Sequence, residues 1–543
     1  MSVNTPGEPK QSNPGLSRRQ FVQLGGAALA AGAALPACPA SGARPHLGLP
    51  SCRPNFVFLI TDQERYPQYW PDGWAETNLP SRQRLAERGV TFTNAFCSAS
   101  MCSASRASLF TSQYPSQHGV KCVLMASDTS QSTLQPPPEQ PNLASMLASA
   151  GYDVQYRGKW HLSKDPTGTA DVQSSRDLER YGFRGWQPPE SGQDELPAHF
   201  GGGDTNYDAQ YAEQAAEFLR NAHALSPQPF ALVVCLSNPH DIMAHPSLWN
   251  QPSFSDTPPW NTSNNYGKDA PGCFDQGISL PPDATLHENL AANFKPASHA
   301  QSLALFNARL GALDTAELQH DYVNFYAYLH TLTDGHFGTI LDALESNPAL
   351  NHKTIVIRLA DHGEMGLSHG GLRQKTFNAY EETIHVPLVI SNPALFKGPV
   401  RSDALISLVD IMPTIAALAD VPDRDTYDFK GRDFSGVIQD AVDNPGNPTA
   451  AVQDAVLFTT DEVAQQVVEQ PYHVRCLRER DWKFVMNFDP VGGRPPQFEL
   501  YDLINDPMEL QNRAHPDAPY YDEAKTNEMK DKLANKLAEI GEA

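Results

Sequence analysis

The sequence predicts an α/β fold, in which a large, mixed and mostly parallel sheet is sandwiched by helices and a small α+β subdomain follows. Continuous apolar runs that end in polar residues recur through the first 450 of the 543 residues. Such runs are typical of strands buried on both faces, as in parallel sheets. Beyond residue 450 the runs become short. The length also exceeds the ~250–300 residues that one core usually holds, which favours more than one domain.

The individual elements follow from these runs and from helical spacing. We expect strands at 55–60, 91–96, 151–156, 229–236 and 354–360, and a covering helix at 321–344. In the C-terminal part we expect short strands at 455–459, 472–477 and 482–487 and an amphipathic helix at 522–540. Residues 245–310 are rich in Pro, Asn and Ser with little periodicity, so they are interpreted as a loop-like insertion. The predicted organisation is therefore a leader at 1–50, a large domain at 51–450 and a small antiparallel-sheet subdomain at 451–543.

The first 50 residues have the layout of an export signal. Arg18 and Arg19 precede Phe21, and a charge-free apolar run follows at 24–35. The paired arginines are typical of a twin-arginine (Tat) signal, and the run is shorter than the ~20 residues that span a bilayer. We therefore expect Tat export to the periplasm or beyond and no transmembrane span. The residues before Cys38 form a weak lipobox, which leaves a lipid anchor on Cys38 open.

Composition excludes some partners. The chain carries 40 basic and 63 acidic side chains, a formal charge of −23. This charge argues against nucleic acid and against broad capture of polyanions, although a small anion can still bind where cations are concentrated. The eight cysteines include no CxxC pair, so neither a zinc module nor a dense disulfide framework is indicated.

The stretch 96–111 is the strongest candidate for chemistry. Small hydroxyl residues surround Cys102, Arg106 follows four positions later, and an apolar helical pattern begins behind them. Ser103 or Ser105 is expected to cap the helix, and Cys102 then lies where the helix N-terminus favours an anion. A lone cysteine in a helix is more often a buried packing residue, so the pattern alone leaves that alternative open.

The segment Cys102-Ser103-Ala104-Ser105-Arg106 resembles the signature of type I sulfatases, in the alkaline phosphatase superfamily. In that family a separate formylglycine-generating enzyme oxidises the cysteine to formylglycine (3-oxoalanine), and the hydrate of this aldehyde is the nucleophile. The resemblance implies that Cys102 is so modified and that Arg106 supports it. Ala104 replaces the family's proline, and Phe110-Thr111-Ser112 replaces Leu-Thr-Gly.

A metal centre is also implied by the resemblance. Asp62 ends the first predicted strand, where ligands gather in α/β sheets, but on its own it is equally well a helix cap. Sulfatases begin with such a strand, and the family implies that Asp62, Asp361, His362 and the modified Cys102 hold one divalent metal. Calcium suits this mainly oxygen shell, with manganese and magnesium left open. Gln63 stands where many members have a second carboxylate, as in the choline-sulfatase and phosphonate monoester hydrolase-like branch.

The remaining site residues follow the same resemblance. Lys159 and His161 are two apart at a strand end, so they share a face, either of a solvated edge or of a site. The segment that contains them matches the family's Gly-Lys-Trp-His-Leu motif. This match implies that Lys159 and His161 contact the formylglycine and the sulfate. The family also implies that His240 protonates the leaving alcohol, that Lys375 contacts the sulfate, and that Gln63, Lys159, His240 and Lys375 bind substrate. His385 replaces the arginine of Tyr-Glu-Glu-x-x-Arg-Val-Pro, and 499–510 resembles the family's C-terminal antiparallel sheet.

These resemblances predict an arylsulfatase-like sulfuric ester hydrolase acting on a small organic sulfate, aryl or small alkyl. Arg106, Lys159 and Lys375 would neutralise the sulfate oxygens, and His161 or Asp361 would accept a proton from the second hydroxyl of the hydrate. The aromatic residues after Asp62 are either core or part of the substrate entrance: Tyr66, Tyr69, Trp70 and Trp74. Two alternatives remain, a phosphonate monoester or phosphodiester hydrolase and an inactive sulfate-ester-binding protein in which Cys102 stays a thiol.

Overall fold

The structure is a computed structural model. It describes residues 53–66, 68–125, 130–167, 172–192, 201–202, 206–222, 228–247, 272–462 and 468–542. The predicted leader, with Arg18, Arg19 and Cys38, lies outside these residues. The chain divides into two compact units, Met1–Arg44 and Pro45–Ala543, and the described residues all belong to the second. Within the described residues, no helix has the length and apolar character needed to span a bilayer.

A seven-stranded sheet forms the centre, with the strand order β3-β4-β1-β5-β6-β2-β7. The strands are β1 (Asn55–Asp62), β2 (Gly89–Phe96), β3 (Asp153–Gly158), β4 (Phe230–Pro239), β5 (Thr354–Ala360), β6 (Leu388–Ser391) and β7 (Val400–Ser407). All neighbours pair in parallel except β6, which is antiparallel to both β5 and β2. The predicted mixed, mostly parallel sheet is confirmed.

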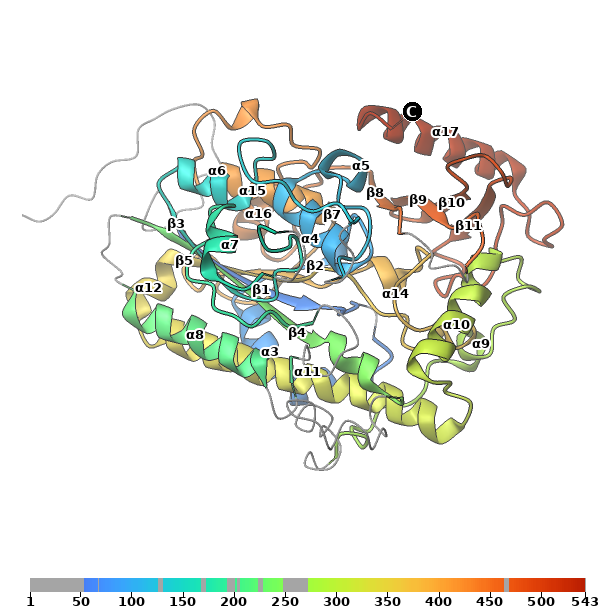
Figure 1. Ribbon diagram of the computed structural model, residues 1–543, viewed down its shortest axis with the longest axis horizontal. Coiled ribbons are helices and arrows are strands. Elements are labelled where there is room, and N and C mark those ends of the chain that lie inside the picture. The colour runs from blue at the N-terminus through green and yellow to red at the C-terminus, as the bar shows by residue number, and fades with distance from the viewer. Residues whose placement is uncertain are drawn as a thin grey trace, which may run out of the picture. The chain divides into compact units, whose positions relative to one another are not determined.

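Helices cover both faces of this sheet (Figure 1). One face packs against α4 (Cys102–Thr111), α6 (Leu143–Ser149), α15 (Ile411–Leu418) and α16 (Ser435–Asp443). The other packs against α3 (Pro80–Glu87), α8 (Tyr207–Asn221), α11 (Ala316–Glu345) and α12 (Pro348–Lys353). Strand β1 contributes to the hydrophobic cores on both faces of the sheet. Its Phe58 and Ile60 belong to the core on the first face, and its Val57 and Leu59 belong to the core on the second. This double burial explains its uninterrupted apolar sequence.

A second, four-stranded antiparallel sheet follows, with the order β11-β10-β9-β8. Its strands are β8 (Ala455–Thr460), β9 (His473–Glu479), β10 (Trp482–Phe488) and β11 (Gln497–Asp502), and α17 (Glu523–Glu539) packs on it through Met529 and Leu533. In Figure 1, β8 is the strand of this sheet that lies nearest α5 (Pro115–His118). The predicted small α+β part is therefore present, while its domain boundary at 450 stays a prediction.

The insertion at 245–310 differs from the prediction. Its described part contains α9 (Asp283–Leu286) and the 14-residue α10 (Ala297–Leu310). The buried face of α10 includes Ser298, His299 and Ser302 besides Phe306 and Leu310, so apolar periodicity is faint there. The other short elements are α2 (Trp74–Asn78), α7 (Ser175–Glu179), α13 (Ser368–Gly371), α14 (Glu381–Ile384) and 3₁₀ turns at His240–Ala244, Leu408–Asp410 and Arg424–Thr426.

Candidate active site

Four of the predicted site residues lie at the carboxyl ends of four adjacent strands. Asp62 ends β1, Lys159 follows β3, His240 follows β4 and Asp361 follows β5. In the sheet these strands have the order β3-β4-β1-β5, so one edge presents all four side chains. This is where ligands bind in open α/β sheets.

Cys102 is the first residue of the fully buried helix α4. The N-cap position is Met101, with φ 69°, and no side chain caps the helix. The expectation that Ser103 or Ser105 is the cap is wrong, because both hydroxyls make tertiary contacts. Ser103 Oγ accepts a hydrogen bond from Leu124 N at 3.0 Å, and Ser105 Oγ donates to the Asp361 carbonyl. These hydroxyl groups therefore hold the helix in place within the site, and they do not cap its first turn.

Asp62, Cys102, Asp361 and His362 form one cluster, in which a ligand atom from each lies within 4.8 Å of the others. His362 Nε2 is 3.2 Å from Cys102 Sγ and 3.6 Å from Oδ1 of both aspartates. Cys102 Sγ is 3.5 Å from Asp62 Oδ1. Cys102 contributes its thiol sulfur to this cluster. Carboxylates with an imidazole are donors that suit a divalent cation.

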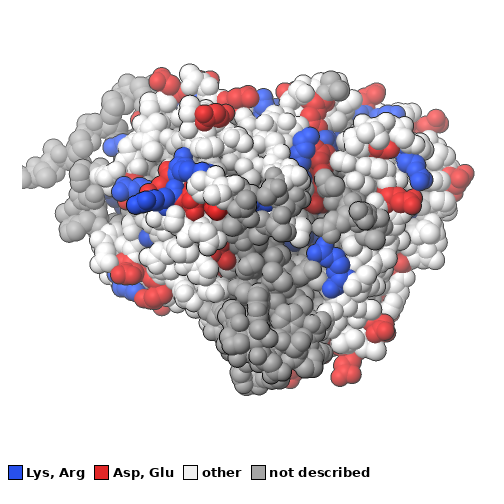
Figure 2. All heavy atoms as spheres, in the orientation of Figure 1, with Lys and Arg blue, Asp and Glu red and all other residues white. Residues whose placement is uncertain are grey.

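Cations surround the opposite oxygens of the two aspartates. Arg106 binds Asp62 Oδ2 at 3.2 Å and Asp361 Oδ2 at 3.0 Å, and Lys159 Nζ pairs with Asp62 Oδ2. Both cationic side chains are fully buried. On the surface in Figure 2, by contrast, basic and acidic residues lie interspersed among mainly uncharged ones. Positive charge is therefore concentrated inside the site of an acidic protein, as anion binding requires.

Lys375 reaches the same site through Gln63. Its Nζ donates to Gln63 Oε1 at 2.6 Å, and Gln63 Nε2 donates to Glu364 Oε2 at 2.5 Å. Glu364 also accepts a hydrogen bond from Tyr322 at 2.8 Å. Glu364 was not among the predicted site residues, although it follows His362 closely in sequence. It orients Gln63, and Gln63 in turn orients Lys375.

These charges shift the pKa values of the cluster. Burial and Asp62 raise the pKa of Cys102, but Lys159, Lys375 and His362 outweigh them and hold it well below its usual range. Burial likewise raises the pKa of Asp62, but Lys159 and the other cations hold it well below its usual range. Burial and the neighbouring Asp62 raise the pKa of Asp361 to about 6. The site therefore stabilises an anion at position 102.

The two predicted histidines differ in placement. His240 is buried, and its pKa falls to about 3 because of burial and the nearby Lys159. Asp62, Lys375 and Cys102 also act on it, so it belongs to the site. His161 Nε2 lies 2.6 Å from the carbonyl oxygen of Leu124. Among described residues, His161 forms no hydrogen bond or ion pair with the cluster, and its contact with sulfate stays a prediction.

One further acidic side chain approaches the site from the C-terminal sheet. Glu462 is the second residue after β8, and its Oε2 accepts a hydrogen bond from Val123 N at 2.9 Å. Burial raises its pKa to about 8, with Lys375 and Cys102 among the groups that act on it. Nothing in the sequence pattern indicates this approach, because Glu462 follows a strand of another sheet, 360 positions after Cys102.

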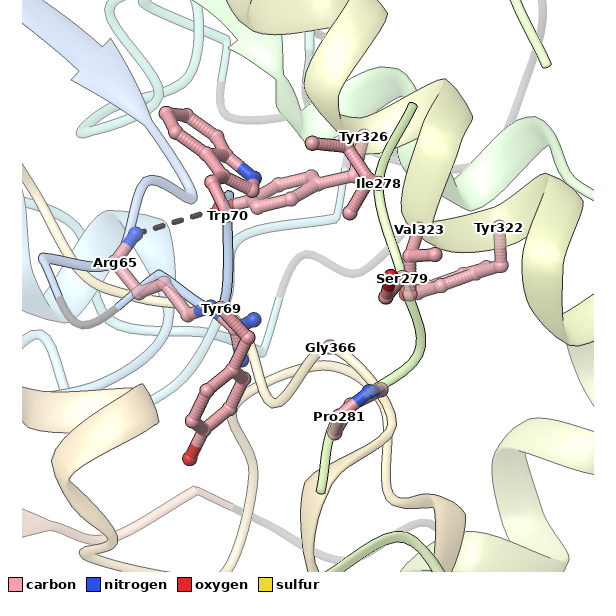
Figure 3. A pocket seen from close by; sticks show the side chains of 10 residues that line it. All are labelled: Arg65, Tyr69, Trp70, Ile278, Ser279, Pro281, Tyr322, Val323, Tyr326 and Gly366. Carbon is pink, nitrogen blue, oxygen red and sulfur yellow. Dashed lines mark hydrogen bonds between the residues drawn. The ribbon is translucent and has the colours of Figure 1, made fainter. Parts of the chain in front are cut away.

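The aromatic residues after Asp62 pack against neighbouring rings, and their part in a substrate entrance stays a prediction. Trp70 and Trp74 pack together with ring centroids 4.5 Å apart, and Tyr66 stacks on His385 at 4.6 Å. Tyr69 and Trp70 also line a pocket beside the site (Figure 3). The pocket is lined by Arg65, Tyr69, Trp70, Ile278, Ser279, Pro281, Tyr322, Val323, Tyr326 and Gly366. Tyr326, in its wall, donates to the Gln63 carbonyl at 2.7 Å, which fixes this wall to the site.

The fold and the site together define a class of protein, an α/β protein with a cysteine at the N-terminus of a buried helix, beside metal-type ligands and buried cations. The family model described as Sulfatase matches residues 54–421, and the chain therefore belongs to the sulfatase family. It is a sulfuric ester hydrolase. A second model, described as N-sulphoglucosamine sulphohydrolase, C-terminal, matches residues 369–543.

Relatives agree with this assignment. An ulvan-active sulfatase of Formosa agariphila is 28% identical over 90% of this chain and 82% of its own, and arylsulfatase K of Danio rerio is 24% identical over 85% and 80%. Among solved structures, a 2-O GAG sulfatase matches with a TM-score of 0.65 and 21% identity, covering 90% of this chain and 92% of that one. The phosphonate monoester hydrolase of Agrobacterium radiobacter matches with a TM-score of 0.61 and 22% identity, covering 90% and 96%. These two structures support the fold.

Proposed function

We propose that this protein hydrolyses an organic sulfate ester to the alcohol and inorganic sulfate with a formylglycine hydrate derived from Cys102. The observation that carries the proposal is the position of Cys102, at the N-terminus of a buried helix and 3.2 Å from His362. The hydrate supplies a hydroxyl nucleophile and a second hydroxyl whose deprotonation releases the sulfate. A thiol or serine at this position would lack that release route.

A divalent metal fits the donor set. The cations Arg106 and Lys159 occupy Oδ2 of the aspartates, whereas Oδ1 of each faces His362 Nε2. Asp62, Asp361 and His362, together with the modified Cys102, would therefore hold the ion. We propose calcium, with manganese and magnesium as alternatives. The bound ion would supply Lewis-acid stabilisation of negative charge. Chelation is expected to abolish turnover, and titration with each metal identifies the one that restores it.

The side chains divide the remaining work. Arg106, Lys159 and Lys375 place positive charge around the sulfate oxygens and stabilise charge that develops in the transition state. His240 is neutral in the free protein, since its pKa is about 3. A bound sulfate anion offsets the positive lysines and raises this pKa, so that His240 can protonate the leaving alcohol.

The alcohol is proposed from the relatives and from the predicted substrate class. Of the aryl or small alkyl sulfates predicted from the sequence, an aryl sulfate is the simplest chromogenic probe. The relatives' names include ulvan-active sulfatase and N-acetylglucosamine-6-O-sulfatase, which supports a sulfated sugar.

Because Cys102 is buried, its oxidation by a formylglycine-generating enzyme must precede folding. Export of the folded protein through Tat to the periplasm or beyond fits this order, and a lipid anchor on Cys38 remains part of the proposal.

The experiment compares the turnover of an aryl sulfate and a phenyl phosphonate monoester. We expect the sulfate to have the higher kcat/KM, and Cys102→Ala to lower it at least ~1,000-fold, as loss of a nucleophile does. Cys122→Ser is the matched control, because Cys122 is a half-buried cysteine outside the cluster. A higher kcat/KM for the phosphonate would favour the phosphonate monoester hydrolase alternative, for which Gln63 is the supporting residue. Binding of sulfate esters without turnover would favour the inactive binding protein.

A further inference from the structure

The C-terminal sheet reaches the nucleophile helix at the end of strand β8. Thr459 N donates to the Ser98 carbonyl at 2.9 Å, which ties β8 to the loop that leads into α4. The chain then continues through Asp461 to Glu462, both buried. The position of Glu462 is therefore fixed relative to Cys102, four residues beyond Ser98.

A short piece of backbone links Glu462 to the site. Val123 N donates to Glu462 Oε2 at 2.9 Å. The next residue, Leu124, donates its N–H to Ser103 Oγ at 3.0 Å, while its carbonyl lies 2.6 Å from His161 Nε2. Residues 123–124 thus contact three side chains: those of Glu462, of His161 and of Ser103, the residue after Cys102. This arrangement places the Glu462 carboxyl group at the side of the site.

Glu462 has no cationic partner among the described residues, in contrast to its neighbour. Asp461 pairs with Arg475 at 2.7 Å, with His473 at 3.2 Å and with Lys121 at 4.0 Å. Glu462 forms no ion pair in the described part of the chain, although it is only 8% exposed. A buried carboxyl group is costly unless hydrogen bonds or charges compensate it, and a single N–H leaves most of its capacity unused. Such a group in a site indicates an interaction with a ligand.

The chemistry of that ligand follows from the surroundings. Arg106, Lys159 and Lys375 supply the positive charge that the sulfate needs, and an acidic side chain adds none. Glu462 therefore suits the other part of the substrate, the alcohol. Its oxygens can accept hydrogen bonds from a hydroxyl or an ammonium group, but they have nothing to bind on an unsubstituted aryl ring.

We propose that Glu462 is a specificity-determining residue, which accepts a hydrogen bond from a hydroxyl or ammonium group next to the sulfate ester and so selects sulfated sugars over aryl sulfates. This inference rests on the proposed function and adds the residue that recognises the alcohol. The C-terminal sheet then contributes directly to substrate choice.

The test compares kcat/KM for 4-nitrophenyl sulfate with kcat/KM for a panel of glucose, galactose and glucosamine monosulfates. We expect wild-type protein to prefer a member of the panel. Glu462→Ala is expected to lower kcat/KM for that sugar ~3- to 10-fold, the usual effect of a lost hydrogen bond between neutral groups, and to change kcat/KM for the aryl sulfate less than ~2-fold. Glu462→Gln keeps the volume and one acceptor oxygen, so its loss is in the same direction and smaller. Glu469→Gln, an exposed carboxylate paired with Arg494, is the matched control.

Three results would overturn the inference while leaving the proposed function standing. The first is that wild-type protein hydrolyses the aryl sulfate and prefers no sugar sulfate to it. The second is that folded Glu462→Gln loses kcat/KM equally for both substrates. The third is that neither Glu462 variant changes kcat/KM for either substrate. Thermal unfolding of each variant identifies a folding defect. Failure of the proposed function itself looks different, because the wild-type protein would then hydrolyse no sulfate ester at all.

Discussion

At the scale of single residues, the site depends on buried charges that compensate one another. Arg106 bridges Asp62 and Asp361 from one side, and His362 faces both from the other. Glu462, by contrast, forms no ion pair with any cation in the described part of the chain. Asp62, Cys102, Asp361 and His362 could be expected from the sequence because each follows a recognisable strand or motif. Glu462 could not, because tertiary packing alone brings it to the site.

Glu462 gives a pH-dependent prediction. Its pKa is raised from 4.5 to about 8 by burial, so its folded-state value lies above its unfolded one. Its contribution to stability is fully present below pH ~4.5 and is lost as the pH rises through about 8. Glu462→Gln cannot ionise, so its melting temperature relative to the wild type is expected to be higher at pH 9 than at pH 5. Calorimetry at both values measures this difference, and a constant difference would contradict the assigned burial.

At the scale of elements, strand ends position the site and neighbouring helices hold those ends. Continuous apolar runs predicted β1, β4 and β5 correctly, because strands buried on both faces contain few polar residues. Strand β6 was missed because it has only four residues, and β7 because its first half alternates between buried and exposed positions. Helix α10 was missed because its buried face is partly polar. Short or polar elements depend on packing that sequence periodicity does not report.

The end of β4 is held by Asp208, from the first turn of α8. This buried carboxyl group accepts hydrogen bonds from Ser237 N at 2.7 Å, Asn238 N at 2.9 Å and Asn238 Nδ2 at 3.0 Å, two residues before His240. Asp208→Leu leaves three donors without an acceptor and is expected to lower the unfolding free energy by ~2–4 kcal/mol and to lower kcat. Urea denaturation and steady-state kinetics test this. Asp208→Asn keeps an acceptor and should lose less, whereas equal losses for both variants would show that the hydrogen bonds are not the cause.

At the scale of the whole molecule, an ionic network joins the C-terminal sheet to helix α14. Lys483 on β10 pairs with Glu381 at 3.2 Å and also with Glu509, and Arg478 on β9 pairs with Glu381 at 2.9 Å. Glu381 begins α14, which precedes β6 of the seven-stranded sheet. The sequence predicted both sheets but not this network, since its members come from segments far apart in the chain.

Removing Lys483 tests how strongly the C-terminal sheet is joined to helix α14. Lys483→Met leaves Glu509 without this cation, and breaking a buried pair is expected to cost ~3–5 kcal/mol at neutral pH. Glu509 has a pKa raised to about 7 by burial, so it is protonated at pH 5 and the loss should be smaller there. Urea denaturation at pH 5 and pH 8 measures both losses. A loss that is equal at the two pH values would contradict a role for the Glu509 charge.

The most direct test of the proposed mechanism is the mass of the tryptic peptide that spans residues 89–106, from protein produced in a host that matures sulfatases. Trypsin cleaves after Arg88 and Arg106, so this peptide contains Cys102. We expect that Cys102 has lost its sulfur and carries an aldehyde oxygen, with Cys97 in the same peptide unchanged. A thiol at position 102 in protein that nevertheless hydrolyses sulfate esters would contradict the mechanism, because the nucleophile would then be a different group.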